Sequence, residues 1–253
     1  MFFTRLKFLT RVFISKAFLP YLYNKYVKNN EVIIEDINQN FHIRSQKRNL
    51  SLKKKFLHLL VYYPEFAFVF FWRIQSNFFL WEILFKYNQL CKIFTSSLIK
   101  GGLVVYHPYA TVINAKKIGK NFTFRNGLTI GNKNNDNTLL PTIGNNVEVG
   151  ANVVIIGDIE IGDNVTIGAG SVVVKSVPSN CVIAGKAGIV GHIKIADNTT
   201  VGANTGVSKN ITKSGQTLFG YVGYDIKDFL KSYSLFKKLP ELNDRIKELE
   251  KKP

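Results

Sequence analysis

The sequence is poor in cysteine, histidine and methionine. It has two cysteines, Cys91 and Cys181, four histidines and one methionine in 253 residues. Two cysteines imply no disulfide framework, and a reducing compartment such as the cytoplasm fits the chain best. A hydrophobic content of 46% excludes a disordered chain and is enough for one sizeable core. We expect no metal cofactor.

Acidic residues are also scarce, because 17 Asp and Glu stand against 34 Lys and Arg. The imbalance is largest in residues 1–100, which hold 16 basic and 5 acidic side chains. These basic residues are interleaved with Phe, Leu, Tyr and Trp and are not grouped into a motif that reads nucleic acid. We therefore expect no nucleic-acid partner.

The chain lacks an uninterrupted hydrophobic run. Its richest apolar stretch, FLHLLVYYPEFAFVFFWRI at residues 56–74, contains His58, Pro64 and Glu65. A membrane span needs about 20 mostly apolar residues without such interruptions. The stretch therefore predicts a buried or interfacial helix.

The opening MFFTRLKFLTRVFISKAF has the pattern of a basic amphipathic helix. Its apolar residues recur at helical spacing, with Arg and Lys among them: Phe2, Leu6, Leu9 and Phe13. Such a helix lies on anionic membranes, or else packs on the protein's own core. A signal peptide is disfavoured, because cationic residues interrupt every apolar run. We expect a cytoplasmic protein with peripheral contact at the inner face of the membrane.

From residue 106 onward the chain has a period of six. Neither a helix, with 3.6 residues per turn, nor a strand, with a period of two, repeats in this way. Short strands separated by tight corners and stacked as a solenoid do. A second apolar column, which includes Val147 and Val153, fills the interior between the anchors. The central block of anchors, several followed by glycine, is Ile143, Val149, Ile155, Ile161, Ile167 and Val173.

Two further blocks keep the period in other phases, and loops are predicted between the blocks. The polar segment NKNNDNTLLPT makes the step from Ile130 to Ile143 13 residues long. The step from Val173 to Ile183 is ten residues, so we expect Lys175–Cys181 to protrude and Ile183 to resume the stack above Val173. The outer blocks are Tyr106, Val112, Ile118, Phe124 and Ile130, and Ile183, Ile189, Ile195, Val201 and Val207.

The phrase TIGNNVEVGANVVIIGDIEIGDNVTIGAGSVVVKSVPSN resembles the hexapeptide-repeat acyltransferases. The likeness is to their serine acetyltransferase-like branch, which includes O-acetyltransferases of surface polysaccharide synthesis. It covers about residues 56–185, with YYPEF and YHPYATVIN. The resemblance implies a left-handed parallel β-helix, a homotrimer, acetyl-CoA as acyl donor, and a hydroxyl on a sugar or other small molecule as acceptor.

His107, in the stretch VVYHPYATVIN, matches the general-base histidine of that branch. Such a base takes the proton of the acceptor hydroxyl while the oxygen attacks the thioester. The D-I-H-P stretch of true serine acetyltransferases falls at residues 92–95, which read KIFT, and their second active-site histidine corresponds to Leu140. Serine is therefore disfavoured as acceptor. A structural role for His107 stays open.

The resemblance also implies that the donor lies along the small residues of the G-A phrases and near a lysine that follows the V-V-V run. The candidate cofactor-binding residues are therefore Ala151, Ala169 and Lys175. Plain solenoid corners would show the same G-A phrases, and a single lysine is a weak phosphate signal.

A second resemblance begins at the ten-residue step. NCVIAGKAGIVGHIKIADNTTVGANTGVSKNI and the tail after it look like the C-terminal end of the UDP-3-O-acylglucosamine N-acyltransferase of lipid A synthesis. This likeness implies, as an alternative, N-acyl transfer from an acyl carrier protein, with His192 assisting at the acyl site. The upstream base of that family has no counterpart here, and His192 also fits a solvated corner residue.

The tail carries a heptad seam flanked by Lys and Glu, which predicts a helix that assembles chains or packs on its own solenoid. Pro240 suggests that the helix begins there. The chain thus divides into a basic helical region (1–100), a β-helix acyltransferase domain (101–220) with a phase break at 174–182, and a helical tail (221–253). A catalytically silent trimeric scaffold is a further alternative. The seam comprises Leu235, Leu239, Leu242, Ile246 and Leu249.

Overall fold

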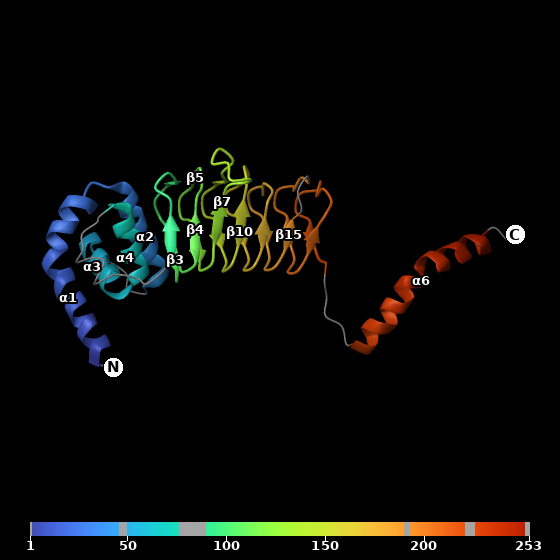
Figure 1. Cartoon of the computed structure of the whole chain (residues 1–253), viewed down its shortest axis with the longest axis horizontal. Helices are drawn as coiled ribbons and strands as arrows, with labels where there is room; N and C mark the ends of the chain where they lie inside the picture. The colour runs from blue at the N-terminus through green and yellow to red at the C-terminus, as the bar shows by residue number, and fades with distance from the viewer. Residues whose placement is uncertain (1, 46–49, 76–89, 190–192, 221–225, 251–253) are drawn as a thin grey trace. The chain divides into compact units, whose positions relative to one another are not determined.

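The structure is a computed structural model that describes residues 2–45, 50–75, 90–189, 193–220 and 226–250. It divides into two compact units, residues 1–220 and 221–253. The first unit consists of a helical region followed by a stack of β-coils (Figure 1). The second contains helix α6 (Ile226–Glu250).

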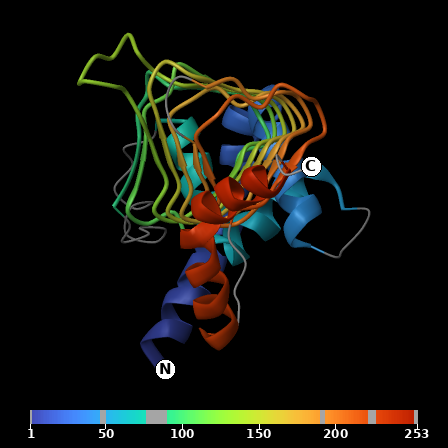
Figure 2. The ribbon, with the colours of Figure 1, turned by 90° about the vertical axis from the view of Figure 1, so that its right-hand side faces the viewer.

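Short parallel strands form three sheets, A, B and C, around a common interior (Figure 2). Sheet A contains β1 (Cys91–Ile93), β4 (Thr111–Ile113), β7 (Thr129–Gly131), β10 (Val154–Ile156), β13 (Val172–Val173), β15 (Gly188–Ile189) and β17 (Gly206–Val207). Sheet B contains β2 (Leu98–Ile99), β5 (Lys117–Ile118), β8 (Thr142–Ile143) and β11 (Glu160–Ile161). Sheet C contains β3 (Val104–Tyr106), β6 (Thr123–Arg125), β9 (Glu148–Val149), β12 (Thr166–Ile167), β14 (Val182–Ile183), β16 (Thr200–Val201) and β18 (Thr217–Leu218). Sheets A and C each contain seven strands, which correspond to about seven coils. This arrangement confirms the predicted parallel β-solenoid.

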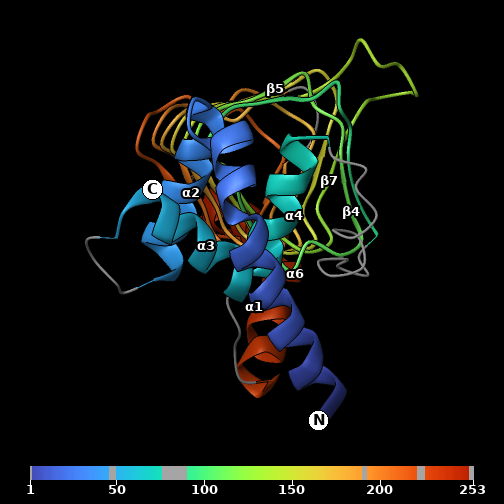
Figure 3. The same cartoon turned by 90° about the vertical axis from the view of Figure 1, so that its left-hand side faces the viewer.

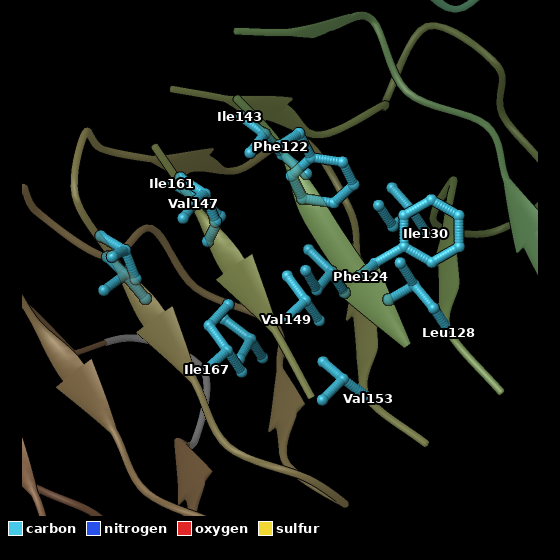
Figure 4. Close-up of a cluster of buried hydrophobic side chains, with 14 of the residues drawn as sticks. Phe122, Phe124, Leu128, Ile130, Ile143, Val147, Val149, Val153, Ile161 and Ile167 are labelled. Carbon is cyan, nitrogen blue, oxygen red and sulfur yellow. The ribbon is translucent and has the colours of Figure 1, made fainter. Parts of the chain in front are cut away.

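The sixfold period places one apolar side chain of each strand in the interior. In sheet C, Phe124 pairs with Val149, which is followed by Ile167, and all three are buried. Figure 4 shows how Phe122 and Phe124 fill the space between aliphatic side chains of neighbouring coils. Burial of this surface, at about 25 cal/mol per Å² of apolar area, is the main stabilising contribution to the stack.

Asparagines turn one corner of the solenoid. Asn146, Asn164 and Asn180 have left-handed backbones, with φ between 54° and 60°, a conformation that asparagine adopts more readily than most residues. The amide of Asn146 donates to Asn164, and that of Asn164 donates to Asn180, each at 3.0 Å. The repeat therefore fixes the corner through both backbone preference and side-chain hydrogen bonds.

The first block of the period differs from the expectation by one residue at each of two anchors. Val105 and Ile113 are fully buried, whereas Tyr106 is half-buried and Val112 is 40% exposed. The expected interior positions of Tyr106 and Val112 are therefore wrong. The step between the true anchors is eight residues, so the corner that contains His107 is two residues longer than in a regular hexad.

The ten-residue step does not extrude the expected loop. Val177 is buried and forms a parallel bridge with Ile161, and Cys181 is also buried. The step therefore consists of four residues and then six, and the coil is shortened by two. The expectation that Lys175–Cys181 protrude is wrong.

Ile183 stacks on Ile167, and not above Val173 as expected. Val173 instead pairs with Ile189 on sheet A. Ile183, Ile189 and Ile195 belong to the same buried cluster as the central block, so the solenoid continues through the phase break. A step of four residues is enough to reach sheet B, because Val177 occupies the interior position that an anchor of a regular hexad would take.

The polar segment after Ile130 does protrude from the stack (Figures 2 and 3). Lys133 and Asp136 form an antiparallel bridge within it. At its base, the Asn114 amide donates to Asn137 Oδ1 at 3.2 Å. The extra residues thus leave the coil without disturbing the interior register.

The helical region contains α1 (Phe2–Leu22), the π-helix η1 (Tyr23–Val27), α2 (Glu31–Arg44), α3 (Leu52–Tyr62) and α4 (Pro64–Arg73). The run at 56–74 is therefore two helices, because Pro64 starts α4 at a position where its missing N–H is not needed. Both are lined with buried apolar residues, as predicted. No helix in the described ranges is long and apolar enough to cross a membrane.

Helices α2 and α4 pack against β3, the edge strand of sheet C, and close this end of the solenoid (Figure 1). Asp36 accepts the Leu103 N–H at 2.7 Å, and the Asn40 amide donates to the Leu103 carbonyl at 2.8 Å. Arg73 donates to Asp36 at 2.9 Å and to the carbonyl of Lys100 at 2.7 Å. These side chains satisfy polar backbone groups in the corner between β2 and β3, at the open end of the stack.

Helix α1 has two different faces. Ser15, Leu19 and Leu22 are buried in the helical core, whereas Leu9 and Phe13 are exposed. Part of the helix therefore packs on the protein's own core, and the predicted stripe through Leu9 and Phe13 is left uncovered in this unit.

Helix α6 begins at Ile226, so the expected start at Pro240 is wrong. The proline lies inside a helix of 25 residues. The five residues of the heptad seam are all exposed within the chain.

Candidate functional site

His107 lies in the lengthened corner between β3 of sheet C and β4 of sheet A. Its φ is 48°, a left-handed conformation that is uncommon outside glycine but less rare for histidine and asparagine. Its carbonyl accepts the Tyr109 N–H at 2.7 Å, which tightens the turn. The imidazole is 59% exposed, so the corner presents this side chain outward.

Glu65 holds one nitrogen of that imidazole. Its Oε1 lies 3.3 Å from His107 Nδ1, and its side chain is only 8% exposed. Glu65 sits in the first turn of α4, next to Pro64, and α4 packs directly on β3. The carboxylate thus faces Nδ1, while most of the ring remains accessible to solvent.

Aromatic rings and guanidinium groups alternate beside His107. The Arg44 guanidinium carbon lies 5.2 Å from the Tyr63 ring centre and 4.7 Å from that of Tyr106. The Arg125 guanidinium lies 5.0 Å from the same Tyr106 ring. We call Tyr63, Arg44, Tyr106 and Arg125 the cation–aromatic ladder. It runs from the helical region to the second coil of sheet C.

Ala151 and Ala169 lie in the same corner column as His107. Their coils are joined there by backbone hydrogen bonds, from Gly170 N–H to the Ala151 carbonyl and from Lys186 N–H to the Ala169 carbonyl, each at 2.8 Å. Nearer His107, the Gly127 N–H donates to the Tyr109 carbonyl at 2.9 Å. The structure therefore aligns both alanines with His107 along one edge of the solenoid.

The glycines of the G-A phrases have a structural explanation. A Cβ at Gly150 would lie 2.5 Å from the Ala169 nitrogen, and one at Gly168 would lie 2.4 Å from the Gly185 nitrogen. Close stacking of the coils thus requires glycine at both positions. Ala169 is exposed and Ala151 half-buried, so both alanines are accessible for a ligand.

Lys175 lies at a different corner, between sheets A and B. It lines an open recess of about 780 Å³ beside the shortened coil, together with Glu160, Asp163 and Lys194. Within one chain, Lys175 is therefore not brought together with His107 and the two alanines. His192 lies outside the described residues.

Neither cysteine is suited to act as a nucleophile. Burial raises the pKa of the Cys91 thiol to about 12 and also raises the pKa of Cys181. At neutral pH both remain protonated and unreactive. In the described part of the chain, no three His, Cys, Asp or Glu side chains form a group that could hold a metal ion.

Sequence reasoning missed Glu65, Tyr109 and Arg125. Glu65 appeared as a charge that interrupts an apolar run and as part of YYPEF, but neither feature linked it to His107, although a carboxylate in such a run is expected to have a partner when buried. The ring of Tyr109 lies 6.0 Å from that of His107 at an interplanar angle of 15°. Arg125 stands 18 residues after His107, which is three hexads, and this spacing was the signal that could have linked them.

Comparison with known proteins identifies the repeat and then individual relatives. Residues 141–175 match the family described as bacterial transferase hexapeptide (six repeats). The putative colanic acid biosynthesis acetyltransferase WcaB of Escherichia coli (strain K12) is 51% identical over 83 residues, which are 32% of this chain and 51% of that protein. The serine acetyltransferase of Synechococcus elongatus is 41% identical over 86 residues, which are 33% of this chain and 35% of that protein.

A crystal structure of serine acetyltransferase from Neisseria gonorrhoeae in complex with serine superposes with a TM-score of 0.49 at 23% identity. The superposition covers 64% of this chain and 69% of that one. The chain spans about half the length, or less, of the first two relatives.

Proposed function

We propose that this protein is an O-acetyltransferase that moves an acetyl group from acetyl-CoA to a hydroxyl of a sugar or related small molecule. The observation that carries the proposal is the exposed His107 imidazole, whose Nδ1 lies 3.3 Å from the buried Glu65 carboxylate. This pairing directs the Nδ1 proton to the carboxylate and leaves Nε2 free as a base. The names of the relatives, which are acetyltransferases, support the transfer chemistry.

In the proposed reaction, Nε2 of His107 accepts the proton of the acceptor hydroxyl as its oxygen attacks the thioester carbonyl carbon. The carbon–sulfur bond then breaks, and the proton passes from the imidazolium to the departing sulfur. Glu65 positions the ring and stabilises the imidazolium between these steps. The products are an acetyl ester and the free thiol of CoA.

A homotrimer would complete the donor site. Ala151 and Ala169 share the His107 corner, whereas Lys175 lies at another corner of the same chain. In a trimer the Lys175 corner of one copy could face the His107 corner of its neighbour, and all the candidate donor-binding residues would then meet. The exposed heptad seam of α6 offers a second contact between copies.

We also propose peripheral contact with the cytoplasmic face of an anionic membrane through α1. Leu9 and Phe13 are exposed on this helix, next to the exposed Lys16. Such a helix fits the interface between membrane and water. Its apolar side chains enter the acyl-chain region, and its basic side chain is attracted by lipid phosphates. The acceptor would then be made or used at that surface.

The C-terminal likeness to the UDP-3-O-acylglucosamine N-acyltransferase stays a proposal about the origin of this segment. Lipid A N-acyl transfer from an acyl carrier protein is less favoured than acetylation, because the relatives above are named acetyltransferases. A silent scaffold is less favoured as well, because a buried carboxylate beside an exposed histidine has no evident scaffolding purpose.

A thiol-release assay tests the proposal. Full-length protein is incubated with acetyl-CoA, or with an acyl carrier protein charged with an acyl chain, and with a panel of serine, sugars and nucleotide sugars. We expect thiol release that depends on both acetyl-CoA and a hydroxyl acceptor. The raised thiol pKa values of Cys91 and Cys181 keep the protein's own background low. Absence of release with every acceptor would contradict the proposal, and release only from the carrier protein would favour the alternative.

A further inference from the structure

The cation–aromatic ladder ends at the guanidinium group of Arg125, next to Tyr106. Arg44, inside the ladder, is engaged by protein groups, since its Nε donates to Asn40 at 3.2 Å and its Nη2 donates to the Val105 carbonyl at 2.5 Å. Arg125, at the end, is exposed. Among the described residues no carboxylate lies within ion-pair distance of it.

The Arg125 guanidinium carbon lies 5.0 Å from the centre of the Tyr106 ring, within the range of a cation–π contact. The rotational freedom of the side chain is reduced before any ligand binds, so less entropy is lost on binding. The ladder thus holds the five N–H donors of Arg125 next to Tyr106.

The fork lies beside the candidate base. Arg125 is paired with Tyr106 in the register of β3 and β6, and Tyr106 directly precedes His107. One residue beyond the paired Phe124 and Val149, the next coil has Gly150, which adds no side chain above Arg125. Among the residues that the structure describes, Glu65 is the one carboxylate within ion-pair distance of His107, and it is buried. Arg125 is therefore an exposed cation near His107, and the exposed Glu148 on β9, which pairs with Thr123, lies outside ion-pair distance of it.

We propose that Arg125 binds an anionic group of the acceptor, a carboxylate or a phosphate, and that the acceptor is therefore an acidic or phosphorylated sugar. Bidentate pairing with either anion suits the arginine fork. The exposed ring of Tyr109, nearly parallel to His107, offers a face for the sugar ring. The inference rests on the proposed O-acetyl transfer and adds the acceptor class to it.

The test compares a neutral sugar with its uronic acid and its phosphate as acceptors. In the wild-type protein we expect at least one anionic form to give about 10-fold or higher kcat/KM than the neutral form. Arg125→Met should lower kcat/KM for that form about 10- to 100-fold, as the loss of charge-assisted hydrogen bonds typically does, without changing the neutral form. Arg125→Lys should recover part of the loss, because lysine keeps the charge but not the fork. Comparison of the uronic acid with the sugar phosphate shows whether Arg125 recognises a carboxylate or a phosphate.

Lys117→Met is the matched control. Lys117 is an exposed cation on β5 of sheet B, away from the His107 corner, so its loss should leave all three acceptors unaffected. A preference of the wild-type protein for the neutral sugar, or an unchanged anionic preference in Arg125→Met, would overturn the inference. So would an increase in the KM for acetyl-CoA alone, which would assign Arg125 to the donor.

Direct binding separates this inference from the proposed function. Calorimetry with glucose, glucuronic acid and glucose 6-phosphate is carried out on His107→Ala, with and without Arg125→Met. Weaker binding of an anionic sugar by 10-fold or more in the double variant supports the anion site even if no acceptor turns over. Equal binding of all three sugars by both proteins would overturn it independently of catalysis.

Discussion

At the scale of single residues, the backbone at His107 determines how its side chain is presented. The left-handed turn projects the imidazole away from the coil, toward the N-terminal turn of α4. A regular hexad corner would be two residues shorter and would not place a histidine beside Glu65. The lengthened corner therefore joins the solenoid to the helical region at the candidate site.

Replacement of either partner in this pair should reduce turnover. We expect His107→Ala to lower kcat about 100-fold or more, because the base is lost. Glu65→Gln should lower kcat less, by about 10-fold, with the KM for acetyl-CoA and the unfolding midpoint unchanged, since an amide of similar size keeps the packing but no longer stabilises the imidazolium. Steady-state thiol release measures both.

His42→Ala is the control for this experiment, because His42 is an exposed histidine on α2. An unchanged rate in His107→Ala would remove it from the mechanism. A Glu65→Gln protein with a lower unfolding midpoint and a normal kcat would show that the carboxylate is only structural.

At the scale of elements, the buried ion pair of Asp36 and Arg73 is one of the contacts that attach the helical region to the first coil. Asp36→Asn should lower the free energy of unfolding by about 3–5 kcal/mol, because Arg73 would keep its buried charge without a counterion. Urea unfolding measures the change. Glu35→Gln, which breaks the exposed pair with Lys120, should cost much less, because solvent screens exposed charges. Equal losses in both variants would contradict the importance of the buried pair.

Membrane contact is a property of α1 that point substitutions can isolate. Deletion of residues 1–20 would remove Ser15 and Leu19 from the helical core, so any loss of binding would be ambiguous. The double variant Leu9→Ser and Phe13→Ser changes only exposed side chains, and we expect it to reduce co-sedimentation with anionic vesicles at low salt several-fold. Leu98→Ser, which alters an exposed leucine on β2, should bind like the wild type. Equal binding of all three proteins would show that α1 is not a membrane contact.

At the scale of the whole molecule, we expect three copies to associate. Light scattering should give three times the 28.7 kDa chain mass at micromolar concentration. Leu239→Lys with Leu242→Lys places charges on the seam of α6 and should shift the assembly toward smaller species on dilution. A wild-type monomer would contradict the trimer. A double variant that dissociates like the wild type would contradict a contribution from α6.

Much of the solenoid was predictable, because each coil repeats the same local rule. The anchors from Ile143 to Val173 occupy the interior as predicted, and the polar segment after Ile130 leaves the stack. The errors fall where coil length changes. A sixfold count placed Tyr106 and Val112 inside, because it does not allow for a step of eight residues between the true anchors, Val105 and Ile113. It also read the ten-residue step as a loop, because Val177 does not stand six residues after Val173.

The sequence by itself determined the repeat, the interior columns and the candidate base, because these depend on residue type and spacing along one chain. Only the tertiary structure decided what surrounds His107. Glu65 comes from a helix 42 positions earlier, and Arg125 comes from the following coil. Glu65 lies outside the repeat, and its proximity results from the packing of α4 on β3. Arg125 stands 18 residues after His107, which is three hexads, but only the stacking of β6 on β3 shows that it adjoins Tyr106. Contacts between elements depend on where whole elements lie, and local spacing does not record this.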